Sequence, residues 1–176
     1  SGKTGFCFFP AQALAQQVGI RNAQLAATKG LGFVLPDEPA GVQRGLALPS
    51  RGFSVVDRID ALDLEKGFVA GTKRVDPNEW FFRAHFFQDP VMPGSLGLEA
   101  LLQLLKVYAR ERFGKLADTH RFQSVAVGVE HRWQYRGQVV PTNKEVQVQA
   151  TITRVEDNLI VADGQLAADG RVIYSM

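Results

Sequence analysis

The sequence predicts an α+β fold in which a curved antiparallel sheet wraps around one long central helix. Two observations lead to this prediction. A helix is expected from about Ser95 to Phe113, and between Leu96 and Ala109 most residues are apolar, which indicates a helix that is buried on almost all sides. Beyond this helix, apolar residues recur at every second position, which is the period of strands with one buried face.

The start of the long helix is marked by proline. Pro93 lies just before it, where the missing N–H of a proline costs nothing. The strongly polar residues that precede Arg110 in the helix are Glu99, Gln103 and Lys106. Their spacing of four and then three residues puts them in one stripe along the helix surface.

Strands are predicted on both sides of the helix in the sequence. Before the helix, residues 53–60 and 68–75 are candidates, with a turn at 63–67 between them. Asp169-Gly170 is predicted to form a tight hairpin turn, because this pair tolerates positive φ. After the helix, the alternating pattern predicts strands at 125–136, 146–153, 159–168 and 172–176.

The first 50 residues differ from the rest and are rich in proline and glycine. Residues 11–29 contain many Ala, Gln and Leu residues and are predicted to be helical, with a break at Gly19. Residues 30–50 show no sustained period. We therefore divide the chain into a linker-like or strap segment, 1–50, and a folded domain, 51–176.

Composition excludes several classes of protein. A chain of 176 residues corresponds to one domain, or one domain plus an appendage. The net charge of +2, from 20 Lys and Arg against 18 Asp and Glu, argues against nucleic-acid binding. No apolar run is long enough to span a membrane and no signal peptide is visible, so a cytoplasmic location is expected. Cys7 is the single cysteine, which excludes a disulfide scaffold and a cysteine metal cluster.

Candidate chemistry is concentrated between residues 80 and 105. His85 lies among aromatic residues, a loop bracketed by prolines leads to Gly94, and Glu99 follows early in the helix. Each has an ordinary structural explanation, since Glu99 could belong to a solvated stripe and His85 to a hydrogen-bonded aromatic cluster. Together they supply a base, an acid and a helix N-terminus within one short stretch.

The other two histidines are weaker candidates. His131 alternates with Val129 and Trp133 on an apolar strand face, which predicts a packed side chain. His120 lies in a polar turn and is expected to be exposed. Cys7 is given no catalytic role.

The chain from about residue 50 to 176 resembles the β-hydroxyacyl-(acyl carrier protein) dehydratases of the hotdog fold, and within them the dehydratase/isomerase (FabA-like) branch. Two departures concern isomerisation, because Glu99 stands where that branch has aspartate and Ser95 where it has cysteine. The resemblance is carried by His85-Phe86, Asp89-Pro90-Val91-Met92-Pro93-Gly94, Leu96-Gly97-Leu98-Glu99-Ala100, Gln103-Leu104, Asp57-Arg58, Trp80-Phe81-Phe82, residues 137–142 and residues 169–174.

The resemblance implies removal of water from a 3-hydroxyacyl thioester to give a trans-2-enoyl thioester, with no metal and no cofactor. It implies His85 as the base and Glu99 as the acid. The N–H of Gly94 would polarise the thioester carbonyl. Three residues support them: the Val91 carbonyl would hold the second ring nitrogen of His85, Gln103 would orient Glu99, and Ser95 lies beside Gly94.

The resemblance also implies partners. The substrate would arrive on acyl carrier protein, and each active site would combine residues of two subunits, in a homodimer or in a pseudo-dimer with a second hotdog domain. The turn Glu156-Asp157-Asn158 is acidic, where free-standing relatives carry basic residues, so docking of an acidic carrier there should be weak. This favours a dehydratase domain cut from a polyunsaturated fatty acid or polyketide synthase.

Two alternatives remain open at this point. A hotdog thioesterase would use its carboxylate to activate water and would release a free acid. A non-catalytic, dehydratase-like domain of a synthase would have a structural role only. The presence of both His85 and Glu99 argues against the second alternative.

Overall fold

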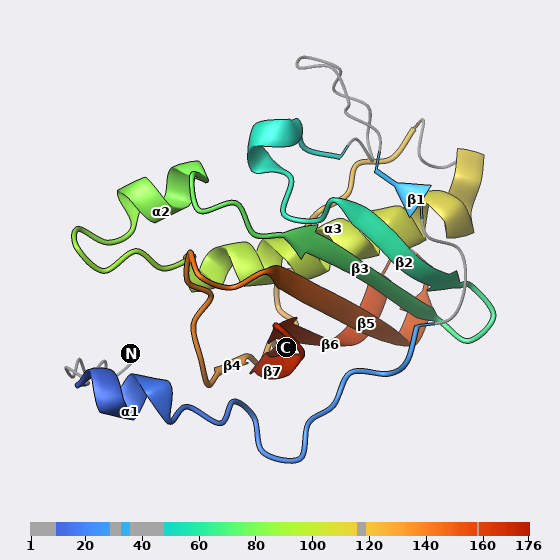
Figure 1. The fold of residues 1–176 in the computed structure, drawn as a ribbon. Coiled ribbons are helices and arrows are strands. Elements are labelled where there is room, and N and C mark those ends of the chain that lie inside the picture. The colour runs from blue at the N-terminus through green and yellow to red at the C-terminus, as the bar shows by residue number, and fades with distance from the viewer. Residues whose placement is uncertain (1–9, 29–32, 36–47, 116–118, 158) are drawn as a thin grey trace.

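The computed structural model describes residues 10–28, 33–35, 48–115, 119–157 and 159–176. Within these residues, α3 (Gly94–Phe113) is the one long helix, and it packs on a seven-stranded antiparallel sheet of order β1-β2-β3-β5-β6-β7-β4 (Figure 1). The strands are β1 (Phe33–Val34), β2 (Arg58–Asp63), β3 (Phe68–Arg74), β4 (Gln134–Tyr135), β5 (Glu145–Glu156), β6 (Leu159–Ala168) and β7 (Arg171–Ser175). This arrangement confirms the predicted α+β fold.

The sheet is built from hairpins. β2 pairs with β3, β5 with β6, and β6 with β7, while the pairing of β3 with β5 joins the strands on either side of α3 in the sequence. Asp169 and Gly170 have φ of 48° and 80°, as predicted for a tight hairpin turn. Irregularities in the register at Ile59/Ala61, Ile152/Arg154 and Leu166/Ala167 interrupt the ladder, and such bulges bend a sheet.

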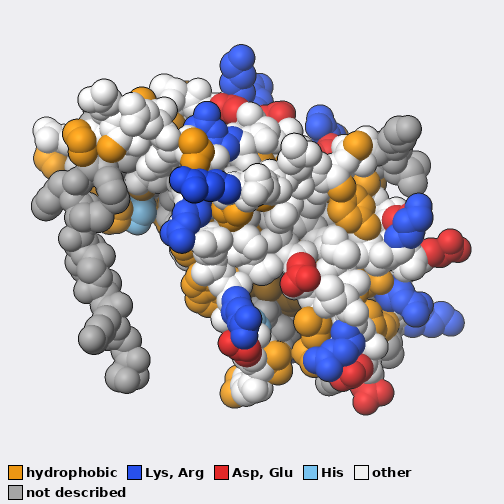
Figure 2. Space-filling model, turned by 90° about the horizontal axis from the view of Figure 1, so that it is seen from below, with side chains coloured by type: hydrophobic (Ala, Val, Ile, Leu, Met, Phe, Trp, Pro, Cys, Tyr) orange, Lys and Arg blue, Asp and Glu red, His pale blue; other side chains and the backbone are white. Residues whose placement is uncertain are grey.

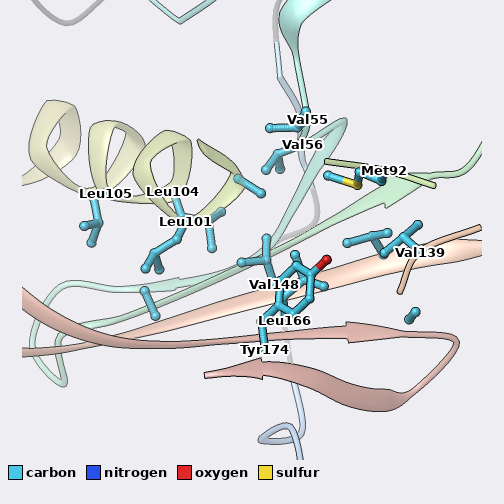
Figure 3. Close-up of a cluster of buried hydrophobic side chains, with 14 of the residues drawn as sticks. Val55, Val56, Met92, Leu101, Leu104, Leu105, Val139, Val148, Leu166 and Tyr174 are labelled. Carbon is cyan, nitrogen blue, oxygen red and sulfur yellow. The ribbon is translucent and has the colours of Figure 1, made fainter. Parts of the chain in front are cut away.

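The core lies between α3 and the concave face of the sheet. Figure 3 shows side chains of α3 facing side chains of the strands, with Leu101 and Leu104 on one side and Leu166 on the other. Close contact depends on glycine, because a Cβ on Gly164 would lie 2.6 Å from Leu101 Cδ1. A Cβ on Gly97 of α3 would likewise overlap the ring of Tyr174 on β7.

Residues 10–28 form a strap across the sheet, on the side away from α3 (Figure 1). The side chain of Gln149 is buried beneath the strap and bonds both backbone groups of Ala26, at 2.8 Å each. The N–H of Ile20 donates to the Val172 carbonyl at 2.8 Å. The strap therefore bonds to the sheet. The division of the chain into a segment 1–50 and a domain 51–176 stays a prediction.

The predicted helix over 11–29 is wrong beyond its first turns. Only α1 (Ala11–Ala15) is helical, and Gly19 and Asn22 have positive φ, at 72° and 61°. Beyond α1, backbone groups of Ile20 and Ala26 bond to the sheet. Helix propensity is a weak preference that such tertiary bonds override.

Two predicted strands also differ from the structure. The strand predicted at 53–60 begins only at Arg58, because the preceding residues form the 3₁₀ turn η1 (Arg51–Phe53) and an irregular link. The strand predicted at 125–136 is reduced to β4, and the residues before β4 are not in the sheet. The N-terminal residues 30–32 and 36–47, for which no period was found, lie outside the described residues.

Candidate active site

A short helix positions His85. α2 (Trp80–Ala84) was not predicted, because its aromatic run has no helical period. Its Phe81 and Phe82 are buried, and His85 caps its C-terminus with its N–H donating to the Phe81 carbonyl at 2.9 Å. Burial of the two aromatic rings thus anchors α2, and this fixes the position of His85 at the end of the helix.

The imidazole of His85 is half-buried and bonded on one side. Its Nδ1 lies 3.1 Å from the Val91 carbonyl, and the N–H of Val91 donates to the His85 carbonyl at 2.8 Å. A carbonyl only accepts, so Nδ1 carries the hydrogen in this contact. The Nε2 atom is left as the nitrogen that can take up a proton. This contact with Val91 is the one expected from the resemblance.

The loop between His85 and α3 is held at both ends. Phe86 and Asp89 exchange backbone hydrogen bonds at 3.0 and 3.2 Å, which closes the loop. Met92 is buried, and its N–H donates to the Val139 carbonyl at 2.9 Å. These bonds fix the path of the chain from the histidine to the start of the long helix.

Gly94 is the first residue of α3, where backbone N–H groups have no partner within the helix. A Cβ at this position would lie 3.3 Å from the ring of Tyr135, whose hydroxyl donates to the Gly94 carbonyl at 3.3 Å. Desolvation raises the pKa of Tyr135, so the phenol remains a donor. A side chain at this position would therefore have to displace the aromatic ring by a few tenths of an ångström. Ser95 is exposed in the same turn.

Glu99 is held by Gln103, one turn further along α3. Gln103 Nε2 donates to Glu99 Oε1 at 3.0 Å and to the Phe53 carbonyl at 3.1 Å, and its Oε1 accepts from the Val55 N–H at 3.0 Å. With 1% of its surface exposed, Gln103 does not belong to a solvated stripe. The solvated-stripe interpretation is therefore wrong for this residue, while Glu99 is half-buried.

His85 and Glu99 are each held in place, but not by each other. No hydrogen bond or ion pair between them is present among the described residues of this single chain. A groove of about 940 Å³ runs along α3 from Leu98 past Leu102, and Glu99 is not among the residues that line it. Its opposite wall is formed by residues 120–127 and 129–133. On the face seen in Figure 2, hydrophobic side chains reach the surface in separate clusters between charged ones.

The other candidates fall outside this arrangement. His131 is exposed, with Nε2 3.2 Å from the Ala126 carbonyl, so the predicted packed role is wrong. His120 is exposed as predicted and lies 2.8 Å from the Thr119 hydroxyl. Cys7 lies outside the described residues. No three His, Cys, Asp or Glu side chains in the described ranges come together as a metal site requires.

Sequence reasoning missed two contacts of the site. Tyr135 meets Gly94 across 41 residues, and Trp80 Nε1 donates to the Gly52 carbonyl at 2.9 Å across 28 residues. Neither pair has a local signal in the sequence, because the two residues of each pair meet only in the folded chain.

None of the described helices has the length and apolar character to cross a bilayer.

Comparisons with known proteins identify the family of the domain. A family model described as a FabA-like domain matches residues 48–176. One subunit of the polyunsaturated fatty acid synthase from Thraustochytrium sp. (strain ATCC 26185 / S-3) is 38% identical over 117 residues. The match covers 62% of this chain but only 8% of that protein.

Solved structures show a similar fold. A chain from the dehydratase heterocomplex ApeI:P of Xenorhabdus doucetiae superposes with a TM-score of 0.53 and 10% identity. The match covers 72% of this chain and 81% of that chain. At this identity the likeness concerns the fold alone, and one long helix on an antiparallel sheet is consistent with the predicted hotdog fold.

Proposed function

Because the chain belongs to the FabA-like domain family, we propose that it is a hydro-lyase that converts 3-hydroxyacyl thioesters on acyl carrier protein into trans-2-enoyl thioesters. The observation that carries this proposal is the bond between His85 Nδ1 and the Val91 carbonyl at 3.1 Å. It leaves Nε2 of a half-buried imidazole as a base for a proton next to a carbonyl.

The proposed reaction balances with two side chains. His85 Nε2 takes the proton from C2 of the substrate, and the electron pair left behind forms the C2–C3 double bond. Glu99 donates a proton to the C3 hydroxyl as the C3–O bond breaks, so that water leaves. The thioester oxygen gains negative charge on the way, and the N–H of Gly94 at the start of α3 would stabilise it.

The surroundings of Glu99 support its role as the acid. Gln103 is itself fixed by backbone groups at Phe53 and Val55, so its bond to Glu99 Oε1 holds one carboxylate oxygen in a set direction. The second oxygen is then oriented for the substrate hydroxyl. Ser95, exposed in the first turn of α3, would contact substrate beside Gly94.

A complete site in this proposal needs two hotdog domains. His85 and Glu99 share no direct bond in one chain, and the apolar groove along α3 lies open beside Leu98. Val127 and Trp133 on the opposite wall of the groove are exposed. A homodimer, or a pseudo-dimer with a second hotdog domain, would cover these side chains and pair the base of one chain with the acid of the other. A solved structure with a similar fold is a dehydratase heterocomplex.

The setting proposed for the domain is a multi-domain synthase. A protein of a polyunsaturated fatty acid synthase is 38% identical to it, and the chain spans a small part of that protein. A carrier on the same polypeptide has a millimolar-scale effective concentration, so docking can be weak. We expect weak, salt-insensitive binding to free carrier protein, tested by titration at low and moderate ionic strength. Tight binding that collapses with salt would favour a free-standing enzyme.

The central test is product analysis. Incubation of the protein with a 3-hydroxybutyryl thioester should give an enoyl thioester that is lighter by one water. A free acid as the product would instead indicate a thioesterase. Absence of turnover, with substrate bound, would favour a non-catalytic domain. The His85→Ala variant is the matched control for contaminating activity.

A further inference from the structure

A buried lysine lies next to the helix that carries His85. Lys73, on β3, has a side chain that is 9% exposed. Its Nζ lies 2.7 Å from Glu79 Oε1 and 3.5 Å from Asp57 Oδ1. A buried ammonium group is costly unless it is paired, and here two carboxylates face it. The pairing links β3 to the residue just before α2.

Glu79 is the N-cap residue of α2, but its side chain makes no capping bond to the helix. It reaches Lys73 instead. α2 has five residues, and a helix that short is held by tertiary contacts rather than by its own hydrogen bonds. The buried rings of Phe81 and Phe82 hold one face of it, but apolar burial is non-directional. At the N-terminal end, direction comes from the ion pair and from the bond of Trp80 Nε1 to the Gly52 carbonyl.

The lysine is itself fixed from the sheet side. Asp57 Oδ2 accepts from the N–H of Arg74 at 2.8 Å, and the N–H of Asp57 donates to the Thr72 carbonyl at 2.9 Å. The carboxylate of Asp57 is thus tied to the end of β3, beside Lys73. A rigid chain of contacts runs from the sheet through Lys73 and Glu79 to α2.

We infer that Lys73 and Glu79 are positioning residues for His85, and that their ion pair sets where α2 presents the imidazole. The inference rests on the proposed function of His85 as the base. The pair touches neither substrate nor His85, so its effect is on geometry. A displacement of about 1 Å at a reacting group can cost about 100-fold in rate.

Kinetics of Lys73→Met and Glu79→Gln test the inference. Each variant should lower kcat about 10- to 100-fold while KM changes less than about threefold, because the pair acts on the position of the imidazole and no residue of α2 lines the groove along α3. The double variant should lose no more than the worse single variant, because both remove one interaction. Lys73→Arg should keep most of the activity.

A matched control is Lys66→Met. Lys66 pairs with Asp63 at 3.3 Å in the turn between β2 and β3, with 83% of its side chain exposed. This variant should leave kcat unchanged. Loss of kcat in the control as large as in Lys73→Met would overturn the inference, as would normal kcat in both Lys73→Met and Glu79→Gln.

A spectroscopic readout separates positioning from catalysis. The three histidines give three Cε1–H signals in a ¹H–¹³C spectrum, and single His→Ala variants assign them. In Glu79→Gln the signal of His85 should shift, while those of His120 and His131 stay fixed. An unmoved His85 signal would overturn the inference even if kcat fell. Wild-type protein without turnover, but with the shift in Glu79→Gln, would overturn the proposed function and leave the positioning intact.

Discussion

Two stretches of this chain hold its three histidines, and they differ in what their side chains contact. In residues 80–103, the polar side chains of the site are bonded within the chain, as His85 is to Val91 and Gln103 to Glu99. In residues 119–135, large apolar side chains are exposed, with Val127 at 89%. The polar side chains of the first stretch thus find partners within one chain, and its exposed large apolar side chains are confined to Trp80 and to Phe86 and Phe87 in the loop after α2. In the second stretch, exposed large apolar side chains recur along most of its length.

Strand register gives the physical reason for the difference. β5 alternates like residues 125–135, but it pairs with β3 on one side and β6 on the other. β4 pairs with β7 so that Gln134 lies opposite Ser175. The residues just before Gln134 pair with no strand among the described residues. Alternation therefore tells which face is apolar, but a strand also needs a neighbouring strand.

The largest expected effect separates the histidines of the two stretches. His85→Ala should lower the dehydration rate by about three to four orders of magnitude, because a general base is lost. His120→Ala and His131→Ala should stay within about twofold of wild type, since both side chains are exposed and contact Thr119 and the Ala126 carbonyl, respectively. Steady-state kinetics with a 3-hydroxyacyl thioester measure this. A large loss in His131→Ala would move the base into the exposed stretch.

The next largest effect should distinguish Glu99 in the first stretch from Glu130 in the second. Glu99→Gln should lose at least about 100-fold in rate, because the amide cannot donate an acidic proton. Glu99→Asp should keep part of the activity. The control is Glu130→Gln, at an exposed residue paired with Arg132, which should be near wild type. Normal turnover in Glu99→Gln would mean that this glutamate has an ordinary structural role.

A charge in the exposed stretch tests whether a second copy covers it. Val127→Asp should weaken self-association about tenfold or more, because burial of an unpaired carboxylate is unfavourable. Val18→Asp, at an exposed position of the strap, is the control and should not alter it. Sedimentation equilibrium measures the dissociation constant. A wild-type protein that is monomeric at all concentrations would exclude the homodimer and leave the pseudo-dimer.

The smallest effect concerns Asp169, in the turn between β6 and β7, whose hydrogen-bond partners all lie in the same chain. Burial alone would raise the pKa of Asp169, but bonds from the Asn143 side chain and from the Lys144 and Glu145 N–H groups outweigh it and lower the pKa. A lowered folded-state pKa adds stability above the unfolded pKa, and this is lost as pH falls through the folded value.

Asp169→Asn should therefore lower Tm at pH 7 by about 2 °C. The difference from wild type should shrink as pH falls below about 4, the ordinary pKa of an aspartate, because the carboxylate is then protonated in the unfolded chain first and in the folded protein at lower pH. Calorimetry at pH 7 and pH 3 measures both values. An equal difference at the two pH values would show that the charge of Asp169 is unimportant.

The parts of the fold that sequence predicted well are those with a regular period and partners in the same chain. α3 begins within one residue of its predicted start, and β6 has the predicted bounds, 159–168. The short helix α2 was missed, because its five residues depend on tertiary contacts. The burial of Gln103 was missed as well, since its backbone partners lie about 50 residues away. The exposure of His131 was missed because alternation does not show whether a neighbouring strand is present to pair with these residues.

The strap has a consequence for the order in which this protein folds. Gln149 and Ala26 bond across 123 residues, and Ile20 bonds to Val172 near the other end of the sequence. On the ribosome the strap emerges before β5 and β7, and it has no surface to dock on until these strands have been made. Contacts so distant in sequence slow folding, because a long loop must close before they form. We therefore expect the strap to dock last, after the sheet has formed, and amide protection at Ala26 should appear later than protection in β5.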